Sequence, residues 1–221
     1  MTSLFRYISP NYADAFVRRG EMLFRSLSYY RDYENDGVRS DEFEGTRAHL
    51  PIDGLKVTMT GTGEVVSLPY TFESTAREDD IFVYCLSTTH SKELADKFGT
   101  KICIEIHQPR HLLGLIRSAI RRRPSIKNKH LEFGAVKYYA QHKPPIIDWA
   151  LPEKIALSKP SSFRWQGEYR VAFAVNDAFK VGNVHTKLVL ASERVKQAST
   201  YHPELMLKLG NLSKICTLHQ F

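Results

Sequence analysis

The sequence predicts an α+β protein that folds as a single domain over residues 1–221. Apolar runs of strand length outnumber the helical patterns, and no repeated strand–helix–strand pattern indicates a doubly wound parallel sheet. The chain has no internal repeat, low-complexity tract or long linker, and its length is roughly one and a half average domains. Because 43% of the residues are hydrophobic, the chain can also bury a full core.

The opening of the chain has the clearest local pattern, a strand, a helix and a second strand. Leu4–Ile8 reads as a short strand, and Ser9-Pro10 supplies an N-cap followed by a proline at the first helical position. Apolar residues then recur at helical spacing up to Gly20, which suits a left-handed C-cap. Glu21–Ser28 alternates apolar and polar residues, as a half-buried strand does.

The rest of the chain predicts short strands with few helices. The polar segment Tyr29–Gly45 is expected to be an irregular, exposed loop. Further strands are expected at Leu55–Met59 and Glu64–Leu68, which form a hairpin, and at Ile81–Ser87, Lys101–Ile106, Ala135–Tyr139, Tyr169–Val175 and Lys187–Leu190. Helices are expected at Ser91–Phe98, Arg110–Arg122 and Pro203–Leu209.

Composition limits the compartment and the partners. Lys and Arg number 31 against 24 Asp and Glu, and the net charge of +7 favours a polyanionic partner such as nucleic acid. No apolar run approaches the roughly 20 residues that span a membrane, and the start lacks a secretory pattern. The three scattered cysteines suit neither a disulfide framework nor a zinc site. We therefore expect a cytoplasmic protein with no membrane partner.

The sequence lacks the motifs of several well-known nucleotide, hydrolase and metal sites. There is no glycine motif of a Rossmann or P-loop nucleotide site, no Gly-x-Ser-x-Gly elbow and no HExxH metal motif. His107 and His111 lie four residues apart, but Pro109 lies between them and no third ligand is evident. We expect no metal site.

A basic cluster lies on and just after the predicted helix Arg110–Arg122. Such a cluster could follow a phosphate backbone, although a solvated basic helix end that complements the helix dipole explains it as well. The candidate nucleic-acid-binding residues are Arg117, Arg121, Arg122, Arg123, Lys127 and Lys129.

Three strand segments carry side chains that could form one site. Arg6 lies in an apolar strand, where its guanidinium needs an anion, either a phosphate or a carboxylate such as Glu168. Ser87-Thr88-Thr89 ends a strand with hydroxyls that could bind a ribose or brace a carboxylate, or else cap the following helix. Gln166 and Glu168 open a late strand, where Glu168 could stabilise positive charge on a sugar or simply pair with Arg170 or Arg6.

The order of these segments resembles the Arg–Ser–Glu class of the ADP-ribosyltransferase superfamily. The matching residues are Arg6, Ser87 and Glu168, with Gln166 two residues before the glutamate. The opening LFRYISPNYADAFVRRGEMLFRS also looks like a widespread group of uncharacterised bacterial and phage proteins, which we take to be ADP-ribosyltransferase-like. The resemblance runs from Leu4 to about Val175 and implies a single domain of split, mixed and antiparallel sheets flanked by short helices.

The resemblance also implies a role for each residue, with NAD as the substrate. Arg6 would hold the phosphates, and Ser87, with Thr88 beside it, would contact the nicotinamide ribose and brace the glutamate. Glu168 would stabilise the oxocarbenium-like transition state, and Gln166 would orient the acceptor. Either aromatic ring of Tyr29-Tyr30 could stack on nicotinamide.

The sequence departs from the superfamily pattern at two places, and the second, at Gln166, resembles members that act on other side chains or on nucleobases. The middle motif reads Ser-Thr-Thr instead of Ser-Thr-Ser, and Gln166 stands where arginine-modifying members have glutamate. The function that the resemblance implies is transfer of ADP-ribose from NAD to a nucleic acid or protein, in a bacterial or phage toxin or defence effector that could have an antitoxin or other partner protein. The alternatives are an NAD glycohydrolase, a non-enzymatic basic nucleic-acid-binding module and an inactive member that acts through interaction.

Overall fold

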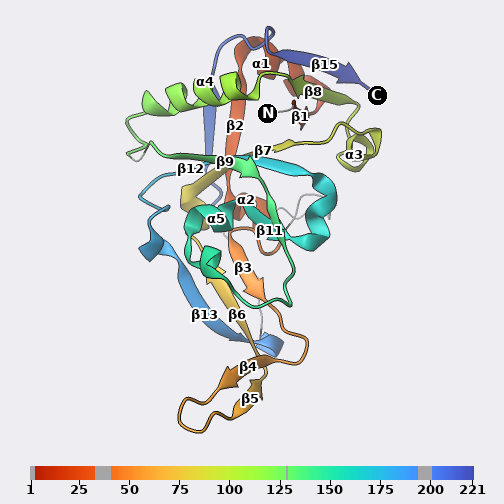
Figure 1. Cartoon of the computed structure of the whole chain (residues 1–221). Helices are drawn as coiled ribbons and strands as arrows, with labels where there is room; N and C mark the ends of the chain where they lie inside the picture. The colour runs from red at the N-terminus through yellow and green to blue at the C-terminus, as the bar shows by residue number, and fades with distance from the viewer. Residues whose placement is uncertain (1–2, 33–40, 128, 194–200) are drawn as a thin grey trace.

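The computed structural model describes residues 3–32, 41–127, 129–193 and 201–221. Within these ranges the chain is mixed α+β, as the sequence predicts, with an eight-stranded sheet and three smaller sheets (Figure 1). The large sheet contains β1 (Leu4–Tyr7), β2 (Glu21–Ser26), β7 (Ile81–Ser87), β8 (Ile102–Ile106), β9 (Leu131–Ala135), β12 (Glu168–Ala174), β14 (Glu204–Lys208) and β15 (Cys216–Gln220).

The smaller sheets are a three-stranded sheet, a hairpin and a parallel pair. Their strands are β3 (Thr46–His49), β6 (Tyr70–Thr75) and β13 (His185–Leu190) in the first, β4 (Leu55–Thr58) and β5 (Val65–Leu68) in the second, and β10 (Lys137–Tyr139) and β11 (Ser158–Pro160) in the third. The α-helices are α1 (Pro10–Arg19), α2 (Leu27–Asp32), α3 (Lys92–Lys97), α4 (Pro109–Arg121) and α5 (Pro152–Ala156). Short 3-10 helices lie at η1 (Glu78–Asp80), η2 (Ile147–Ala150), η3 (Ser161–Gln166), η4 (Val181–Asn183) and η5 (Ala191–Glu193).

The opening forms β1, α1 and β2 in the predicted order, but the strand expected over Glu21–Ser28 ends at Ser26, and Leu27–Asp32 form the helix α2, which the sequence patterns did not predict. Ser9 is the N-cap residue in extended conformation and Pro10 begins α1. Gly20 ends the helix with φ +62°, a conformation that strains residues with a Cβ. A Cβ at Gly20 would also lie 2.4 Å from the carbonyl oxygen of Gly210, so only glycine fits this joint.

The large sheet splits along one edge of β7. On one side β7 pairs with β12 over its whole length, from Ile81 opposite Ala174 to Ser87 opposite Glu168. On the other side β2 pairs with β7 only at Phe82 and Val83, and β1 only at Ser87. The strands β1 and β2 therefore diverge along the middle of β7, and the gap between them positions the candidate site.

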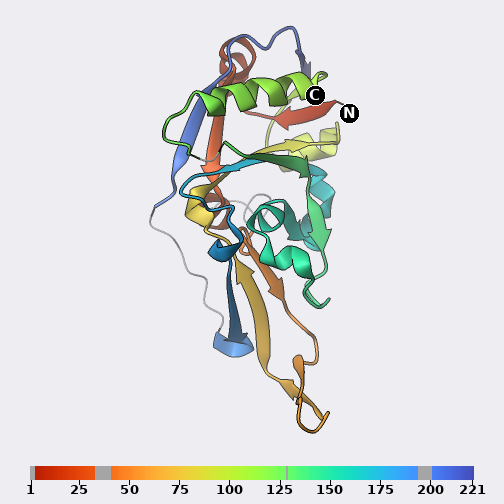
Figure 2. The same ribbon diagram turned by 60° about the vertical axis from the view of Figure 1, so that its left-hand side comes forward.

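Because side chains alternate along each strand, the two faces of the large sheet present different residues and pack in different apolar clusters. Tyr84, Val171 and Phe173 face one side and pack in one apolar cluster with Leu112 and Ile116 of α4. The opposite face carries the site residues of β7 and β12 and a second apolar cluster that includes α5 residues. Figures 1 and 2 show α4 on one side of β7 and β12, with α5 and β11 on the other.

The segment Tyr29–Gly45 is not the exposed irregular loop that the sequence predicts. It begins within α2, residues 33–40 lie outside the described residues, and Asp41 and Glu44 are each 1% exposed. Acidic residues are expected in solvent, but Glu44 pairs with the buried Arg170, and the Asp41 carboxyl accepts a hydrogen bond from the backbone N–H of Phe43.

Two other predicted elements are also wrong. The segment Pro203–Leu209 forms strand β14 instead of a helix, because residues Glu204–Lys208 add to the edge of β2. The predicted strand Ala135–Tyr139 divides at Val136 into the end of β9 and the start of β10, which belong to different sheets. The sequence patterns did not reveal β3, β6, β11, β15 or α5.

Candidate active site

A cleft of about 640 Å³ opens at the gap between β1 and β2. It includes four of the predicted site side chains that were expected to converge, Arg6, Ser87, Gln166 and Glu168. The rest of its lining is Phe5, Tyr7, Ile8, Ser9, Tyr12, Ala15, Glu21, Leu23, Arg25, Tyr29, Tyr30, Tyr84, Cys85, Leu86, Phe98, Gly99, Thr100, Lys159 and Met206. The volume falls within the roughly 300–1,000 Å³ of typical ligand pockets.

Arg6 lies where β1 and β2 diverge from β7. Its Nη1 donates a hydrogen bond of 2.7 Å to the carbonyl of Cys85, and its guanidinium lies 4.6 Å from the ring centroid of Tyr84. Its Nε is buried and has no hydrogen-bond partner within the described ranges. Arg6 and Glu168 do not form the ion pair considered from the sequence. The Nε–H of Arg6 can therefore donate a hydrogen bond to an anionic ligand.

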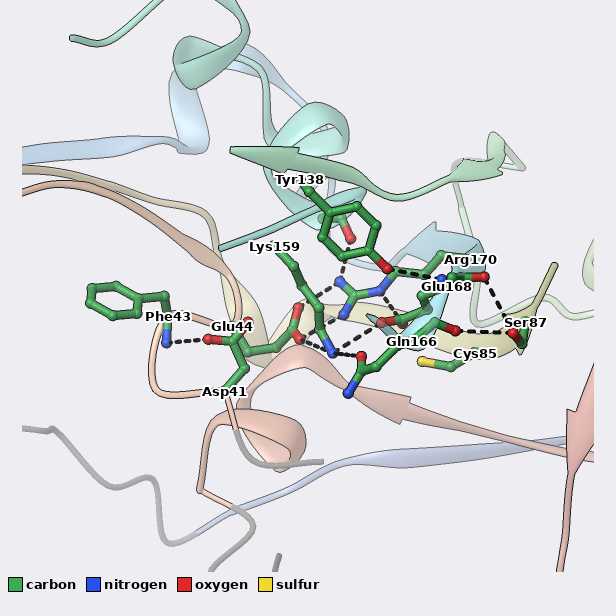
Figure 3. A network of polar contacts seen from close by, with 12 residues as sticks. Asp41, Phe43, Glu44, Cys85, Ser87, Tyr138, Lys159, Gln166, Glu168 and Arg170 are labelled. Carbon is green, nitrogen blue, oxygen red and sulfur yellow. Dashed lines mark hydrogen bonds and ion pairs between the residues drawn. The ribbon is translucent and has the colours of Figure 1, made fainter. Parts of the chain in front are cut away.

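The carboxylate of Glu168 is held by two cations (Figure 3). Its Oε1 lies 2.6 Å from Nε of Arg170, and its Oε2 lies 3.0 Å from Nζ of Lys159. Glu168 is 5% exposed, and burial acts to raise its pKa, but the charges of Arg170 and Lys159 outweigh burial and hold the pKa well below its ordinary value. The Glu168–Arg170 pair considered from the sequence is thus confirmed, and the carboxylate that lines the cleft is ionised.

Glu44 is a second carboxylate that contacts both Arg170 and Lys159. Arg170 is fully buried and donates to both carboxylate oxygens of Glu44 at 2.6 Å, and to the carbonyl of Ala156 at 2.7 Å. Lys159 Nζ lies 3.8 Å from Glu44 as well. Two carboxylates and two cations therefore form a buried, electrically neutral quartet of Glu44, Lys159, Glu168 and Arg170, which we call the charge quartet.

The hydroxyls of Ser87 and Thr88 hold the backbone just before Glu168. Ser87 Oγ donates to the carbonyl of Gln166 at 3.0 Å, and Thr88 Oγ1 donates to the carbonyl of Gly167 at 3.0 Å. Gly167 has φ +51°, and a Cβ there would lie 2.8 Å from the hydroxyl of Thr89. The predicted role of these hydroxyls as a helix cap is wrong, because Ser91 itself caps α3 by accepting from the Leu94 amide.

Thr88 differs from Ser87 in position. Ser87 is 4% exposed and lines the cleft, whereas Thr88 is exposed and lies outside the cleft lining. The structure therefore does not bring Thr88, a predicted ribose-binding residue, into the cleft. Its hydroxyl faces the turn at Gly167 instead.

Gln166 reaches the site from a 3-10 helix and not from the strand that the sequence predicts. It is the last residue of η3, and Gly167 turns the chain into β12. Its Oε1 accepts a hydrogen bond of 3.1 Å from Lys159 Nζ. Gln166 and Glu168 therefore meet through Lys159 and not through strand alternation.

Tyr29 and Tyr30 both line the cleft, from α2. Their rings meet edge to face at 5.3 Å, and the guanidinium of Arg25 lies 4.2 Å from the Tyr29 ring centroid. Burial raises the pKa of Tyr30 well above its ordinary value. Both rings are thus in place to border a bound ligand.

The basic cluster lies away from this cleft. Helix α4 packs on the face of the sheet opposite to Glu168, and Arg117, Arg121, Arg122 and Lys127 are exposed. The other two predicted nucleic-acid-binding residues are occupied: Arg123 donates to the carbonyl of Met206, and Lys129 donates to the carbonyl of Arg123. Four basic side chains therefore form the exposed basic face, and none of them lines the cleft.

The chemistry available in the cleft is electrostatic. The cleft offers an arginine donor, an ionised carboxylate, a buried lysine and several aromatic rings. Burial raises the pKa of the Cys85 thiol to about 12, so Cys85 is protonated near neutral pH and is a poor nucleophile. Within the described ranges no group of three His, Cys, Asp or Glu side chains has the geometry of a metal site.

Sequence reasoning missed Lys159 and Glu44. Lys159 lies in a three-residue strand, and Glu44 lies in an acidic segment that resembles an exposed loop. The local signal at Lys159, a lysine between Ser158 and Pro160 after an apolar segment, is weak.

Comparisons with protein-family models, with curated proteins and with solved structures found no match to this chain. Separately, none of the helices in the described ranges is both long enough and apolar enough to cross a membrane.

Proposed function

We propose that this chain is an NAD-dependent ADP-ribosyltransferase that transfers ADP-ribose to a macromolecular acceptor. The observation that carries the proposal is the meeting of Arg6, Ser87 and Glu168, from three different strands, in one cleft. These residues occur in the order of the Arg–Ser–Glu class that the sequence resembles. The buried Arg6 Nε without a partner and the size of the cleft also fit a phosphate-bearing ligand.

In this proposal each side chain has a distinct task. Arg6 binds the NAD phosphates, and Ser87 fixes the turn before Glu168. The ionised Glu168 stabilises the positive charge that develops on the ribose as the bond between its C1′ and the nicotinamide nitrogen breaks. Nicotinamide leaves with the bonding electron pair, the acceptor forms a new bond to C1′, and the acceptor's proton passes to solvent.

The test measures both nicotinamide release and label transfer. Purified protein is incubated with NAD labelled in its adenylate part, together with DNA, RNA or an extract of proteins. Label on one of these polymers supports the transferase, free ADP-ribose alone supports the glycohydrolase on the same fold, and no nicotinamide release with any acceptor overturns both.

Two variants assign the activity to the cleft. Glu168→Gln is expected to abolish nicotinamide release, because the neutral amide cannot stabilise developing positive charge. Glu64→Gln makes the same chemical change at an exposed position beside β5 and is expected to keep full activity. Thermal melting of both variants shows whether lost activity reflects lost folding.

One observation favours a second function, binding of nucleic acid without catalysis. The exposed basic face, Arg117, Arg121, Arg122 and Lys127, lies on the side of the sheet opposite to the cleft. This alternative predicts salt-sensitive nucleic-acid binding that survives Glu168→Gln, with no nicotinamide release from NAD.

A further inference from the structure

Lys159 reaches the start of β12 because two short strands carry it there. In the parallel pair of β10 and β11, Lys159 lies opposite Tyr138. The hydroxyl of Tyr138 accepts a hydrogen bond of 2.9 Å from the backbone N–H of Glu168. Ser158, beside Lys159, donates to the carbonyl of Ile155 and accepts from Arg47, each at 2.8 Å. The pair therefore fixes both the lysine and the backbone of Glu168.

Lys159 contacts the side chains of both Glu168 and Gln166, which have different roles in the proposed function. Its Nζ lies 3.0 Å from Glu168 Oε2 and 3.1 Å from Gln166 Oε1, and the side chain is 5% exposed (Figure 3). An ammonium group has three donors and no acceptor, so the carboxamide must turn its oxygen toward it. One lysine thus contacts both the carboxamide oxygen of Gln166 and the carboxylate of Glu168.

The other members of the charge quartet cannot perform this task. Arg170 and Glu44 bind each other through two hydrogen bonds and lie outside the cleft lining, whereas Lys159 lines the cleft. Arg170 meets Glu168 at Oε1, the carboxylate oxygen that Lys159 does not hold. Without Lys159, the carboxylate would keep Arg170 as a cationic partner, and the carboxamide oxygen of Gln166 would lose the hydrogen bond from Lys159.

We propose that Lys159 is a positioning residue that holds Glu168 and Gln166 in one arrangement for ADP-ribosyl transfer, an inference that rests on the proposed function. Lys159 does this from a strand that the sequence motifs do not include. Burying a lysine costs desolvation free energy, and a hydrophobic residue could fill the same volume. The presence of a lysine at this position is therefore explained by its polar contacts and not by packing.

The main variant is Lys159→Met, which keeps the length of the side chain and removes the ammonium. The expected result is a kcat for nicotinamide release lower by about 10- to 100-fold, as for other residues that orient site side chains, with the KM for NAD unchanged. Lys137→Met is the matched control, because Lys137 lies on the paired strand β10 and is exposed. A wild-type kcat in Lys159→Met overturns the inference.

A second variant separates the contacts from the balance of charge. Lys159→Met leaves the quartet with a net negative charge, whereas Lys159→Met combined with Glu44→Gln restores neutrality and protects folding. A double variant that melts like wild type and is still slow supports the inference. A double variant that recovers the wild-type kcat overturns it, because charge balance would then be sufficient.

A crystal structure of Lys159→Met provides a readout that does not depend on activity. The Gln166 amide and the Glu168 carboxylate are expected to leave their present orientations, and side chains that stay in place overturn the inference. If the wild-type protein releases no nicotinamide, the proposed function fails, and the crystal structure alone then decides whether Lys159 positions the two residues.

Discussion

Arg170 and Glu168 lie two residues apart on the same face of β12, and Nε of the arginine lies 2.6 Å from Oε1 of the glutamate. Because Arg170 is fully buried and also binds Glu44, this contact ties the first residue of β12 to the interior of the protein. With Arg170 on Oε1 and Lys159 on Oε2, the carboxylate should change orientation little when a ligand binds, which favours electrostatic catalysis by a preorganised group.

Removing Arg170 should strongly destabilise the fold. Arg170→Met leaves Glu44 and Glu168 buried with a single lysine between them, and breaking a buried ion pair from one side costs about 3–5 kcal/mol. The expected result is a loss of that size in the free energy of unfolding, measured by urea denaturation. Arg18→Met, which removes an exposed ion pair with Asp14, should cost under about 1 kcal/mol. Equal losses in the two variants would contradict the structural role of the quartet.

Asp41 should make the protein less stable as pH rises. Burial, with a smaller effect of Glu44, raises the pKa of the Asp41 carboxyl from 3.8 to about 7. The folded protein therefore keeps a proton that the unfolded chain releases near pH 4, so the stabilising contribution is complete below that pH and is lost as pH rises toward 7.

The variant Asp41→Asn removes this dependence. The quantity to follow is the free energy of unfolding of the variant minus that of wild type. This difference should increase from about pH 4 to pH 7, by roughly 1.4 kcal/mol for each unit by which the fold raises the pKa of Asp41. Urea denaturation at a series of pH values measures this difference. Asp53→Asn, at an exposed position, is the control, and a difference that stays flat across the range would show that Asp41 ionises normally.

Arg6→Lys should weaken NAD binding although it keeps the charge. Lysine cannot both donate to the Cys85 carbonyl in the same geometry and present the Nε donor to a ligand. Hydrogen bonds to charged groups contribute about 1.5–3 kcal/mol, so the Kd for NAD should rise roughly 10- to 100-fold in isothermal titration calorimetry. The control is Arg110→Lys, at an exposed position on α4, which should bind NAD as wild type does. An unchanged Kd in Arg6→Lys would show that Arg6 does not contribute to NAD binding.

The exposed basic face should account for the salt dependence of any nucleic-acid binding. Changing Arg117, Arg121, Arg122 and Lys127 to glutamine should weaken binding of a single-stranded oligonucleotide. The slope of log K against log salt should become shallower by about 0.7 for each phosphate of the single strand that the variant no longer neutralises. Fluorescence anisotropy at several salt concentrations measures the slope, and an unchanged slope would mean that nucleic acid binds elsewhere or that the cluster is only a solvated helix end.

The patterns that predicted structure well are local. Pro10 and Gly20 set the limits of α1, and the apolar run Ile81–Ser87 forms β7 with the predicted bounds. The helix predicted over Pro203–Leu209 is wrong because Leu and Met favour helices in isolation, whereas pairing with the edge of β2 makes Glu204–Lys208 a strand. Propensity acts within a few residues, and strand pairing overrides it from far along the chain.

The sequence by itself determined the mixed α+β class, the opening strand–helix–strand unit and the identity of the residues that carry charge and hydroxyls at three strand ends. Only the tertiary structure decided which of these charges meet. It placed Glu168 between Arg170 and Lys159, left Thr88 outside the cleft and put the basic face on the opposite side of the sheet. The physical reason is that periodicity and capping are fixed by neighbours in the chain, whereas a buried ion needs a counter-ion that pairing of distant strands must supply.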